Sequence, residues 1–332
     1  MTMRRILILV LLMAVLPWQG WAVGRDTYTV IISLDGLRWD YLDTYDVPFL
    51  NQLAREGVKA VMQPSFPSKT FPNHYTLATG LSPDHHGIIA NTFWDRERGV
   101  EFSLSNKVTR ADGRYYGGDP VWLTAKHQGV KTATVFWVGS DVAVNNEHPT
   151  YWRDYQTEQL DFPGRVDEII RLLKLPEQDR PHLVMAYFEE PDRSGQNYGP
   201  MHRMTRRAME DLDLLLSNLW ARIQLLPIAS QVDFIVTGDH GMASVDPKRF
   251  VDIDDVLPKH WYDRFCNDYP TLIYASVNVN FRFFLKRIKR RTFISELKTQ
   301  KIITIKKFTG NIQFVGLRII HDIDKNFLRT DL

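Results

Sequence analysis

The feature that most constrains the fold of this chain is a short, β-rich apolar run that occurs four times and leads each time into a polar loop. The first run is Tyr28–Leu34, and the other three lie in the segments VKTATVFWVGSD, PHLVMAYFEEPD and QVDFIVTGDHGM. Runs of this length, rich in valine, isoleucine and aromatic residues, predict strands that are buried on both faces.

Amphipathic segments lie between the apolar runs. Apolar residues recur at helical spacing in VPFLNQLAREG, in Arg165–Leu175 and in His202–Leu226. Strands that alternate with helices predict an α/β fold, with a mostly parallel central sheet and helices on both of its faces.

Four potential metal ligands stand where predicted strands end. They are Asp35, Asp192, Asp239 and His240. Because ligands of such sheets bind at the carboxyl ends of the strands, we expect these side chains to gather at one edge. An aspartate at a strand end is more often a turn former or a helix cap, so each is a weak indication alone. Three such strand ends together favour a metal site.

Composition restricts the chemistry of that site. Cys266 is the only cysteine in the sequence, so an internal disulfide and a thiolate zinc site are both excluded. A transition metal must therefore be held by histidine, aspartate, glutamate or a hydroxyl group. The formal charge of +2 gives no reason to expect binding of a nucleic-acid polymer or an anionic membrane through bulk charge.

The two ends of the chain differ from its centre. Arg4 and Arg5 precede the apolar run Ile6–Leu16, and small residues follow, which predicts a secretory signal peptide over residues 1–22 and export to the periplasm or the medium. An uncleaved membrane anchor is the alternative. No other apolar run is long enough to span a membrane. From residue 276 to 332 the sequence is basic, with six basic residues in Phe281–Arg291, and a solvated basic face is its ordinary interpretation.

A candidate nucleophile lies in FPSKTFPNHYTLATG, residues 66–80. Pro67 and Pro72 stiffen the chain around Thr70, and Thr76–Thr79 can begin a helix. A hydroxyl becomes a useful nucleophile when a metal ion or a base lowers its pKa. A helix N-terminus beside it would favour an anionic phosphate. On this segment alone, a plain capping threonine is an equal alternative.

The segments that carry these residues also resemble a known family. SLDGLRWDYL, QPSFPSKTFPNHYTLATGLSPDHHGIIANTFWD, DPVWLTAKHQGVKTATVFWVGSDV, HLVMAYFEEPDRSGQNYGP and IVTGDHGM are similar, in order and spacing, to motifs of the nucleotide pyrophosphatase/phosphodiesterase family of the alkaline phosphatase superfamily. The resemblance covers residues 28–275, and it implies an alkaline phosphatase-like catalytic domain over that range.

The resemblance implies a zinc-dependent hydrolysis of nucleotide phosphodiester or pyrophosphate bonds. Asp35, Thr70, Asp239 and His240 match the ligands of one zinc ion, with Thr70 as the nucleophile that becomes phosphothreonine. Two zinc ions are expected in the family, where they clamp the phosphoryl group between them.

Three further residues match substrate-binding positions of the family. Asn91 matches the side chain that donates to a phosphate oxygen, a role for which a preorganised amide suits developing charge. Phe71 and Tyr155 match an aromatic pair that holds the nucleobase, and stacking tolerates any base. Without the resemblance, core packing would be the default interpretation of both aromatic residues.

The second zinc site departs from the family pattern. Asp192 is in place, but Gln196 stands where the family has a histidine, and an amide is a poorer zinc ligand than imidazole. A distant C-terminal histidine also has no clear counterpart, because His260 and His321 lack the expected surroundings. His202 is a weak substitute. We therefore expect an incomplete second site.

These departures leave three hypotheses. The chain is a zinc phosphodiesterase, a catalytically impaired relative that binds one zinc ion, or a phospholipid-headgroup phosphodiesterase. A sulfatase is disfavoured because Cys266 does not lie in the motif that sulfatases use. The loss of resemblance after about residue 280 leads to the further hypothesis that the tail 276–332 is truncated or frameshifted.

Overall fold

A computed structural model describes residues 27–155 and 158–246, Lys259, and four strands beyond them. These strands form two antiparallel pairs, β8 (Tyr262–Cys266) with β9 (Leu272–Ala275) and β10 (Lys301–Lys306) with β11 (Phe314–Ile319). The predicted signal peptide and the rest of the predicted tail lie outside the described residues.

The central sheet is parallel, as the sequence predicts. Its strands are β1 (Tyr28–Leu34), β4 (Thr132–Val135), β5 (Tyr151–Arg153), β6 (Leu183–Phe188) and β7 (Val232–Thr237), in the order β5-β4-β6-β1-β7. Strand β1 lies between β6 and β7, with Ile32 beside both Ala186 and Val236. The three strands that lead into Asp35, Asp192 and the Asp239-His240 pair are therefore neighbours.

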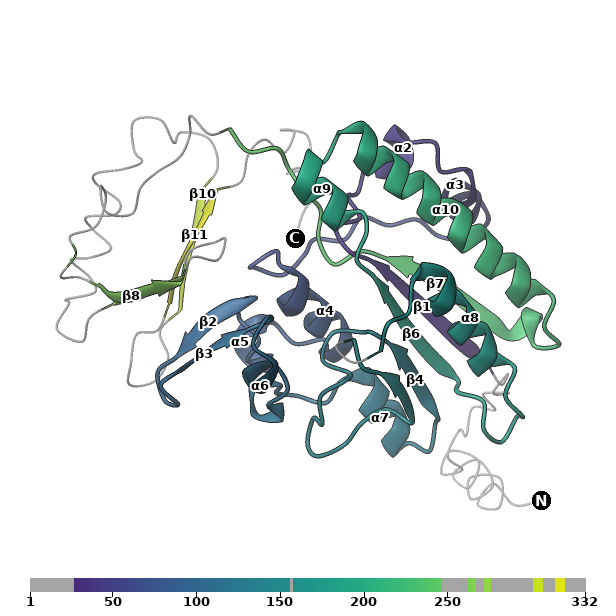
Figure 1. Ribbon diagram of the computed structural model, residues 1–332, viewed down its shortest axis with the longest axis horizontal. Helices are drawn as coiled ribbons and strands as arrows, with labels where there is room; N and C mark the ends of the chain where they lie inside the picture. The colour runs from purple at the N-terminus through teal and green to yellow at the C-terminus, as the bar shows by residue number, and fades with distance from the viewer. Residues whose placement is uncertain are drawn as a thin grey trace, which may run out of the picture.

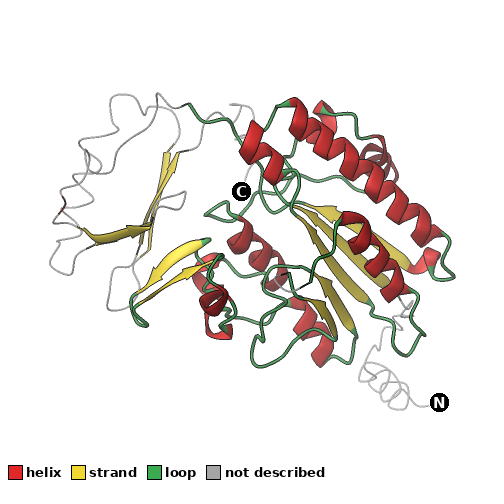
Figure 2. Cartoon of the chain, viewed as in Figure 1, coloured by secondary structure: helices red, strands yellow, loops and turns green. Residues whose placement is uncertain are grey.

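Helices cover both faces of this sheet (Figures 1 and 2). Along one face run α2 (Tyr41–Thr44), α3 (Pro48–Glu56), α8 (Phe162–Leu173) and α10 (Arg203–Gln224), and along the other α4 (Thr70–Thr79), α5 (Pro83–His86) and α7 (Val121–His127). The remaining short elements are β2 (Thr92–Asp95), β3 (Val100–Ser103), α6 (Lys107–Arg110), η1 (Gly113–Tyr115), α9 (Asp192–Tyr198) and η2 (Ala229–Gln231).

The alternation of side chains along the strands builds two separate cores. In β6, Val184 and Ala186 belong to the core under α8 and α10, whereas Leu183 and Met185 belong to the core under α4 and α7. Successive side chains of a strand point to opposite faces, so a strand with helices on both sides must be apolar throughout. This requirement explains the unbroken apolar run of β6. Strand β7 differs from the expectation of burial on both faces, because it lies at the edge of the sheet and leaves Asp233 and Ile235 exposed.

The helix ends follow local capping chemistry. Helix α8 begins three residues before the predicted Arg165, because the side chain of Asp161 accepts a hydrogen bond from the Gly164 amide and Pro163 occupies the first turn. Helix α4 begins at Thr70 and not near Thr76. Pro72 is tolerated there because amides of the first turn have no partner within the helix.

Among the described residues, the helices are all too short or too polar to cross a membrane.

Candidate metal centre

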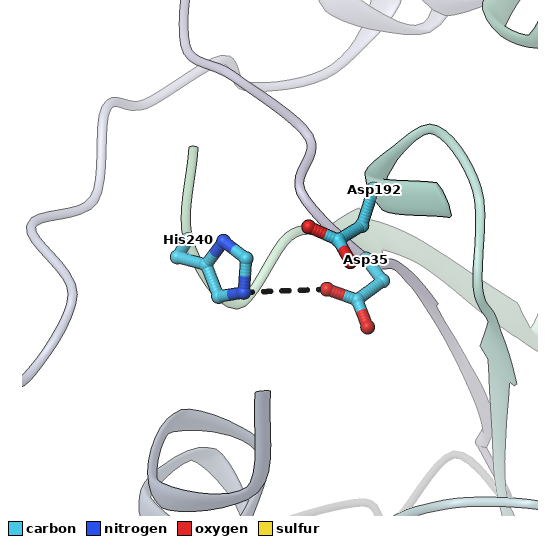
Figure 3. Close-up of side chains that lie close together, drawn as sticks. All are labelled: Asp35, Asp192 and His240. Atoms are coloured by element: carbon cyan, nitrogen blue, oxygen red, sulfur yellow. Dashed lines mark ion pairs between the residues drawn. The ribbon is translucent and has the colours of Figure 1, made fainter. Parts of the chain in front are cut away.

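Three strand ends meet at one point of the sheet edge. Asp35 follows β1, Asp239 and His240 follow β7, and Asp192 begins α9 after β6. The backbone ties these ends together, since the Asp192 amide donates to the Asp35 carbonyl at 2.9 Å and the Gly36 amide donates to Oδ1 of Asp239 at 3.1 Å. Figure 3 shows Asp35, Asp192 and His240 pointing toward one another, and one ligand atom from each lies within 4.8 Å of the other two.

Glycine at position 36 makes this close approach achievable. Its φ of +73° is a conformation that residues with a side chain rarely adopt. A Cβ atom at this position would lie 2.9 Å from Cβ of Asp192. The turn after β1 therefore depends on glycine for its backbone angle and for its contact with Asp192.

The four residues predicted to hold one zinc ion surround a common point. The nearest atoms are Oδ1 of Asp35, Oγ1 of Thr70, Oδ2 of Asp239 and Nε2 of His240. Oδ1 of Asp35 lies 3.5 Å from Oγ1 of Thr70, and Nε2 of His240 lies 3.4 Å, 3.5 Å and 3.2 Å from the Asp35, Thr70 and Asp239 atoms. Four ligands at about 2.0–2.1 Å around a tetrahedral ion are separated by about 3.3 Å. These four separations, out of the six between the four atoms, match the spacing of ligands around a tetrahedral metal ion.

The tautomer of His240 also fits a cation at this point. Nδ1 of His240 lies 2.9 Å from the Gly241 carbonyl oxygen, which can only accept, so Nδ1 carries a hydrogen. In the neutral ring the lone pair of Nε2 then faces Oδ1 of Asp35 and Oδ2 of Asp239. A cation between these atoms would relieve their repulsion, as in metal sites where the second ring nitrogen donates to a carbonyl.

Asp35 is oriented by Tyr187. The Tyr187 hydroxyl donates to Oδ2 of Asp35 at 2.6 Å, which turns Oδ1 toward Thr70 and His240. Asp239 is fixed at one oxygen by the Gly36 amide, while its buried Oδ2 has no hydrogen bond of good geometry and lies 3.3 Å from Nδ1 of His74 and 3.2 Å from Nε2 of His240. A buried carboxylate oxygen without a well-aligned donor is costly, and a metal ion at this point would satisfy it.

The pKa values of the three carboxylates are shifted because the groups are buried close to one another and to histidines. Burial, together with the nearby charges of Asp239 and Asp192, raises the pKa of Asp35 well above its usual value. Burial also raises the pKa of Asp192, with His240 acting in the opposite direction. For Asp239 burial alone would raise the pKa, but His74 and His240 together lower it to about 2. Three carboxylates in one buried site favour an added positive charge.

Thr70 and Asn91 meet at the start of α4. Thr70 is the first residue of the helix, and Oδ1 of Asn91 accepts from the Phe71 amide at 3.1 Å. This bond fixes the amide of Asn91 by its oxygen and directs its Nδ2 group elsewhere. The structure thus brings Asn91, which immediately precedes β2, next to the predicted nucleophile.

Gln196 contacts Asp192, as its spacing on α9 allows. Nε2 of Gln196 donates to Oδ2 of Asp192 at 2.5 Å. Residues four apart on a helix lie on one face, so this is the position from which a histidine would join Asp192 as a ligand. Here the amide donates to the carboxylate instead.

His202 is not part of the cluster of Asp35, Asp192 and His240 among the described residues. Its Nδ1 accepts from the Met204 amide at 3.2 Å as the N-cap of α10, and its ring stacks on Tyr198. His260 and His321 lie outside the described residues.

The two predicted base-stacking residues have different surroundings. Phe71 packs partly buried against the core under α4 and α7. Tyr155 meets the rings of Phe136 and Tyr187 edge-on at 5.4 Å and 6.3 Å. It also lines a cavity of about 610 Å³, which is within the usual size of a small-molecule site. The cavity is otherwise lined by Phe136, Glu158, Gln159, Leu160, Asp161 and Arg165.

Arg165 supports the wall of this cavity. Its buried guanidinium donates to the carbonyl of Tyr187 at 2.7 Å and to both oxygens of Glu189, and it lies 4.8 Å from the Phe136 ring centroid. The same group lies 6.0 Å from the Tyr155 ring. The guanidinium of Arg165 thus forms an ion pair with Glu189 and also lies against the rings of Phe136 and Tyr155.

Sequence reasoning missed Tyr187, His74 and Ser33. Tyr187 and Ser33 lie inside apolar runs, where a polar group resembles an ordinary core residue. His74 is four residues after Thr70, so its place on the same helix face was readable once a helix was assigned to that segment.

Comparison with known proteins identifies the family of this chain. The model of the family described as type I phosphodiesterase/nucleotide pyrophosphatase matches residues 29–318. The chain belongs to this family. The alkaline phosphatase-like fold of the family agrees with the parallel sheet described above.

Relatives and solved structures agree with the family assignment. The chain is 37% identical over 232 residues to human ectonucleotide pyrophosphatase/phosphodiesterase family member 1, covering 69% of this chain and 25% of the relative. It is 39% identical over 223 residues to venom phosphodiesterase 2 of Crotalus adamanteus, covering 66% of this chain and 27% of the relative. The chain therefore spans about a quarter of the length of these curated relatives.

A solved structure of murine ectonucleotide pyrophosphatase/phosphodiesterase 5 is similar in fold. That structure is an inactive threonine-to-alanine variant in complex with AMP. It is 30% identical to this chain, with a TM-score of 0.71, and the match covers 78% of this chain and 68% of that one.

Proposed function

We propose that this chain is a zinc-dependent phosphodiesterase that hydrolyses phosphodiester or pyrophosphate bonds of nucleotides. The observation that carries the proposal is the tetrahedral spacing of Asp35, Thr70, Asp239 and His240, with a hydroxyl among the four ligand atoms. Zinc is the metal that suits a tetrahedral set of carboxylate, imidazole and hydroxyl ligands. A zinc ion held there would lower the pKa of the threonine hydroxyl and stabilise charge on the phosphate oxygens.

The side chains divide the reaction between them. Oγ1 of Thr70 loses its proton and attacks phosphorus, the bond to the leaving oxygen breaks, that oxygen takes up a proton, and phosphothreonine forms. Water then attacks the same phosphorus and the bond from phosphorus to Oγ1 breaks, which releases a nucleoside monophosphate and returns a proton to the Thr70 hydroxyl. Asn91 donates from Nδ2 to a phosphate oxygen, and the N-terminus of α4 favours the anionic phosphate.

The surroundings of Tyr155 support a nucleotide substrate. Its ring stands between Tyr187, which binds Asp35, and the cavity of about 610 Å³. Stacking of a base on Tyr155 and Phe71 would bind different nucleobases with little discrimination. The AMP complex of the murine relative supports the same class of substrate.

A second candidate function is binding without efficient turnover. The bond from Gln196 to Asp192 supports it, because an amide that donates to Asp192 occupies the place of a second metal ligand. Zinc content separates the two candidates. About two zinc ions per chain favour the enzyme, and about one, without turnover, favours the impaired relative.

Export of the protein is also part of the proposal. Its relatives are named as ecto-enzymes and venom enzymes, which supports a secretory function for the first 22 residues. We propose that the mature protein acts in the periplasm or the medium on small phosphodiesters.

The direct test is hydrolysis of a nitrophenyl ester of thymidine monophosphate with added zinc. We expect Thr70→Ala to lower kcat by at least about a thousandfold, because it removes the nucleophile. Thr79→Ala is the matched control, since Thr79 ends the same helix and its hydroxyl bonds locally, donating to the Tyr75 carbonyl at 2.8 Å and accepting from the Leu81 amide at 3.2 Å. Turnover that survives in Thr70→Ala would exclude Thr70 as the nucleophile.

A further inference from the structure

His74 lies completely buried behind the metal centre, at the point where α4, β1 and the end of β7 meet. Its Nδ1 is 2.9 Å from the carbonyl oxygen of Thr70 and 3.3 Å from Oδ2 of Asp239. Its Nε2 is 2.8 Å from the hydroxyl of Ser33. One imidazole thus contacts two of the four predicted ligand residues without being a ligand itself.

The partners of His74 determine where its hydrogen lies. A carbonyl oxygen only accepts, so Nδ1 must carry the hydrogen that it shares with Thr70. In the neutral ring Nε2 is then an acceptor, and the Ser33 hydroxyl donates to it. The Thr70 carbonyl therefore selects the tautomer with the N–H at Nδ1, and the Ser33 hydroxyl complements it by donating to Nε2.

The ring of His74 also packs against the residue that orients Asp35. It meets the Tyr187 ring edge-on at 5.0 Å, and the Tyr187 hydroxyl binds Asp35. On its other side the Trp137 ring lies at 5.4 Å, and the Trp137 indole donates to the His74 carbonyl at 3.2 Å. The ring is therefore held in place by packing as well as by hydrogen bonds.

We infer that His74 is a positioning residue: its Nδ1–H holds the Thr70 backbone and the Asp239 carboxylate in the geometry that binds the metal and aims the nucleophile, and the Ser33 hydroxyl stabilises this tautomer by donating to Nε2. The inference rests on the proposed function. Outer partners of this kind commonly change metal affinity by about 10–100-fold when they are removed.

Two substitutions of His74 test the roles of its two ring nitrogens separately. His74→Asn keeps an N–H donor near the position of Nδ1, toward Thr70 and Asp239. His74→Gln keeps an amide near the position of Nε2, toward Ser33, and has no donor at the position of Nδ1. Both remove the imidazole from the same buried site, so a difference between them reports on the Nδ1–H bond and not on packing.

His86 provides a matched control. It is also completely buried, near the same helix, but it accepts at Nδ1 from the Ile88 amide and bonds through Nε2 to Thr76 and the Pro72 carbonyl. Its hydrogen lies on the opposite nitrogen from that of His74, and its partners are not among the predicted ligands. His86→Gln therefore measures the cost of losing a buried histidine away from the metal centre.

The test is a zinc titration of the purified full chain against a chromogenic chelator, with kcat and KM measured on the nitrophenyl ester. We expect zinc affinity to fall by about 10–100-fold in His74→Gln and by less than about threefold in His74→Asn. In His74→Gln kcat should fall while KM changes little, because His74 does not touch substrate. His86→Gln should lower the melting temperature and leave zinc affinity unchanged.

Several outcomes would overturn the inference. Equal zinc affinity in His74→Gln and His74→Asn would show that the Nδ1–H group does not position the ligands. An equal loss of zinc affinity in His86→Gln would show that losing any buried histidine weakens zinc binding. If His74→Gln does not fold, Ser33→Ala carries the test, with an expected severalfold loss of zinc affinity and an unchanged affinity as the contrary result. Absence of zinc binding in the unaltered chain would instead refute the proposed function, and this inference with it.

Discussion

At the residue scale, the candidate site places carboxylates where their charge costs stability in the absence of a cation. Asp35 is almost completely buried, and its one strong hydrogen bond comes from the neutral hydroxyl of Tyr187. Asp192 and Asp239 add negative charge nearby, and the pKa of Asp35 is raised as a result. Active sites commonly retain such destabilising groups because function requires them.

The prediction at this scale concerns Asp35→Asn in the metal-free protein. The pKa of Asp35 is higher in the folded protein than in the unfolded chain. The contribution of Asp35 to the free energy of unfolding is therefore fully present at pH values below the unfolded-state pKa, and it is lost as the pH rises through the folded-state pKa. Asp35→Asn should therefore raise the free energy of unfolding near neutral pH, because asparagine carries no charge and keeps an oxygen that accepts from the Tyr187 hydroxyl. The gain should shrink as the pH falls to about 4.

Urea unfolding of the chelator-treated protein at both pH values measures this effect. Asp161→Asn is the control, because Asp161 caps α8 away from the metal centre and asparagine caps a helix equally well. A stability of Asp35→Asn below that of the unaltered protein near neutral pH would contradict the account.

At the element scale, the turn after β1 is a point of close contact within the site. Gly36 joins a left-handed backbone angle to direct contact with Asp192 at the start of α9. The strand ends, and with them Asp35 and Asp192, were predictable from the apolar runs. The start of α4 at Thr70 was not predictable, because a proline lies on either side of Thr70 and proline is not typical of a helix.

The prediction at this scale compares two glycines with similar backbone angles. Gly99, in the turn between β2 and β3, has a φ of +66° and open space where an alanine Cβ would lie, whereas a Cβ at Gly36 collides with Asp192. Gly99→Ala should cost about 1 kcal/mol of stability and leave zinc affinity unchanged. Gly36→Ala should cost about 2 kcal/mol or more and weaken zinc binding as well.

Chemical denaturation and zinc titration of the two variants make the comparison. A Gly36→Ala protein that matches Gly99→Ala in both stability and zinc affinity would show that the contact with Asp192 does not shape the site.

At the scale of the whole molecule, a parallel sheet between two apolar cores holds distant segments in register. The alternation of apolar runs and amphipathic segments predicted this architecture, and the strand-end rule predicted where Asp35, Asp239 and His240 meet. The contacts of Tyr187, His74 and Ser33 could not be predicted in the same way. They depend on which face of a strand or helix each side chain occupies and on the exact orientation of neighbouring groups, which a sequence pattern does not specify.

The central claim is that Asp35, Thr70, Asp239 and His240 surround one cation. Its most direct test is an anomalous difference map recorded at the zinc absorption edge from crystals of the zinc-loaded protein. The account predicts a peak about 2.0–2.2 Å from Oδ1 of Asp35, Oγ1 of Thr70, Oδ2 of Asp239 and Nε2 of His240. A map with no peak among these four atoms, or with zinc bound only elsewhere, would contradict it.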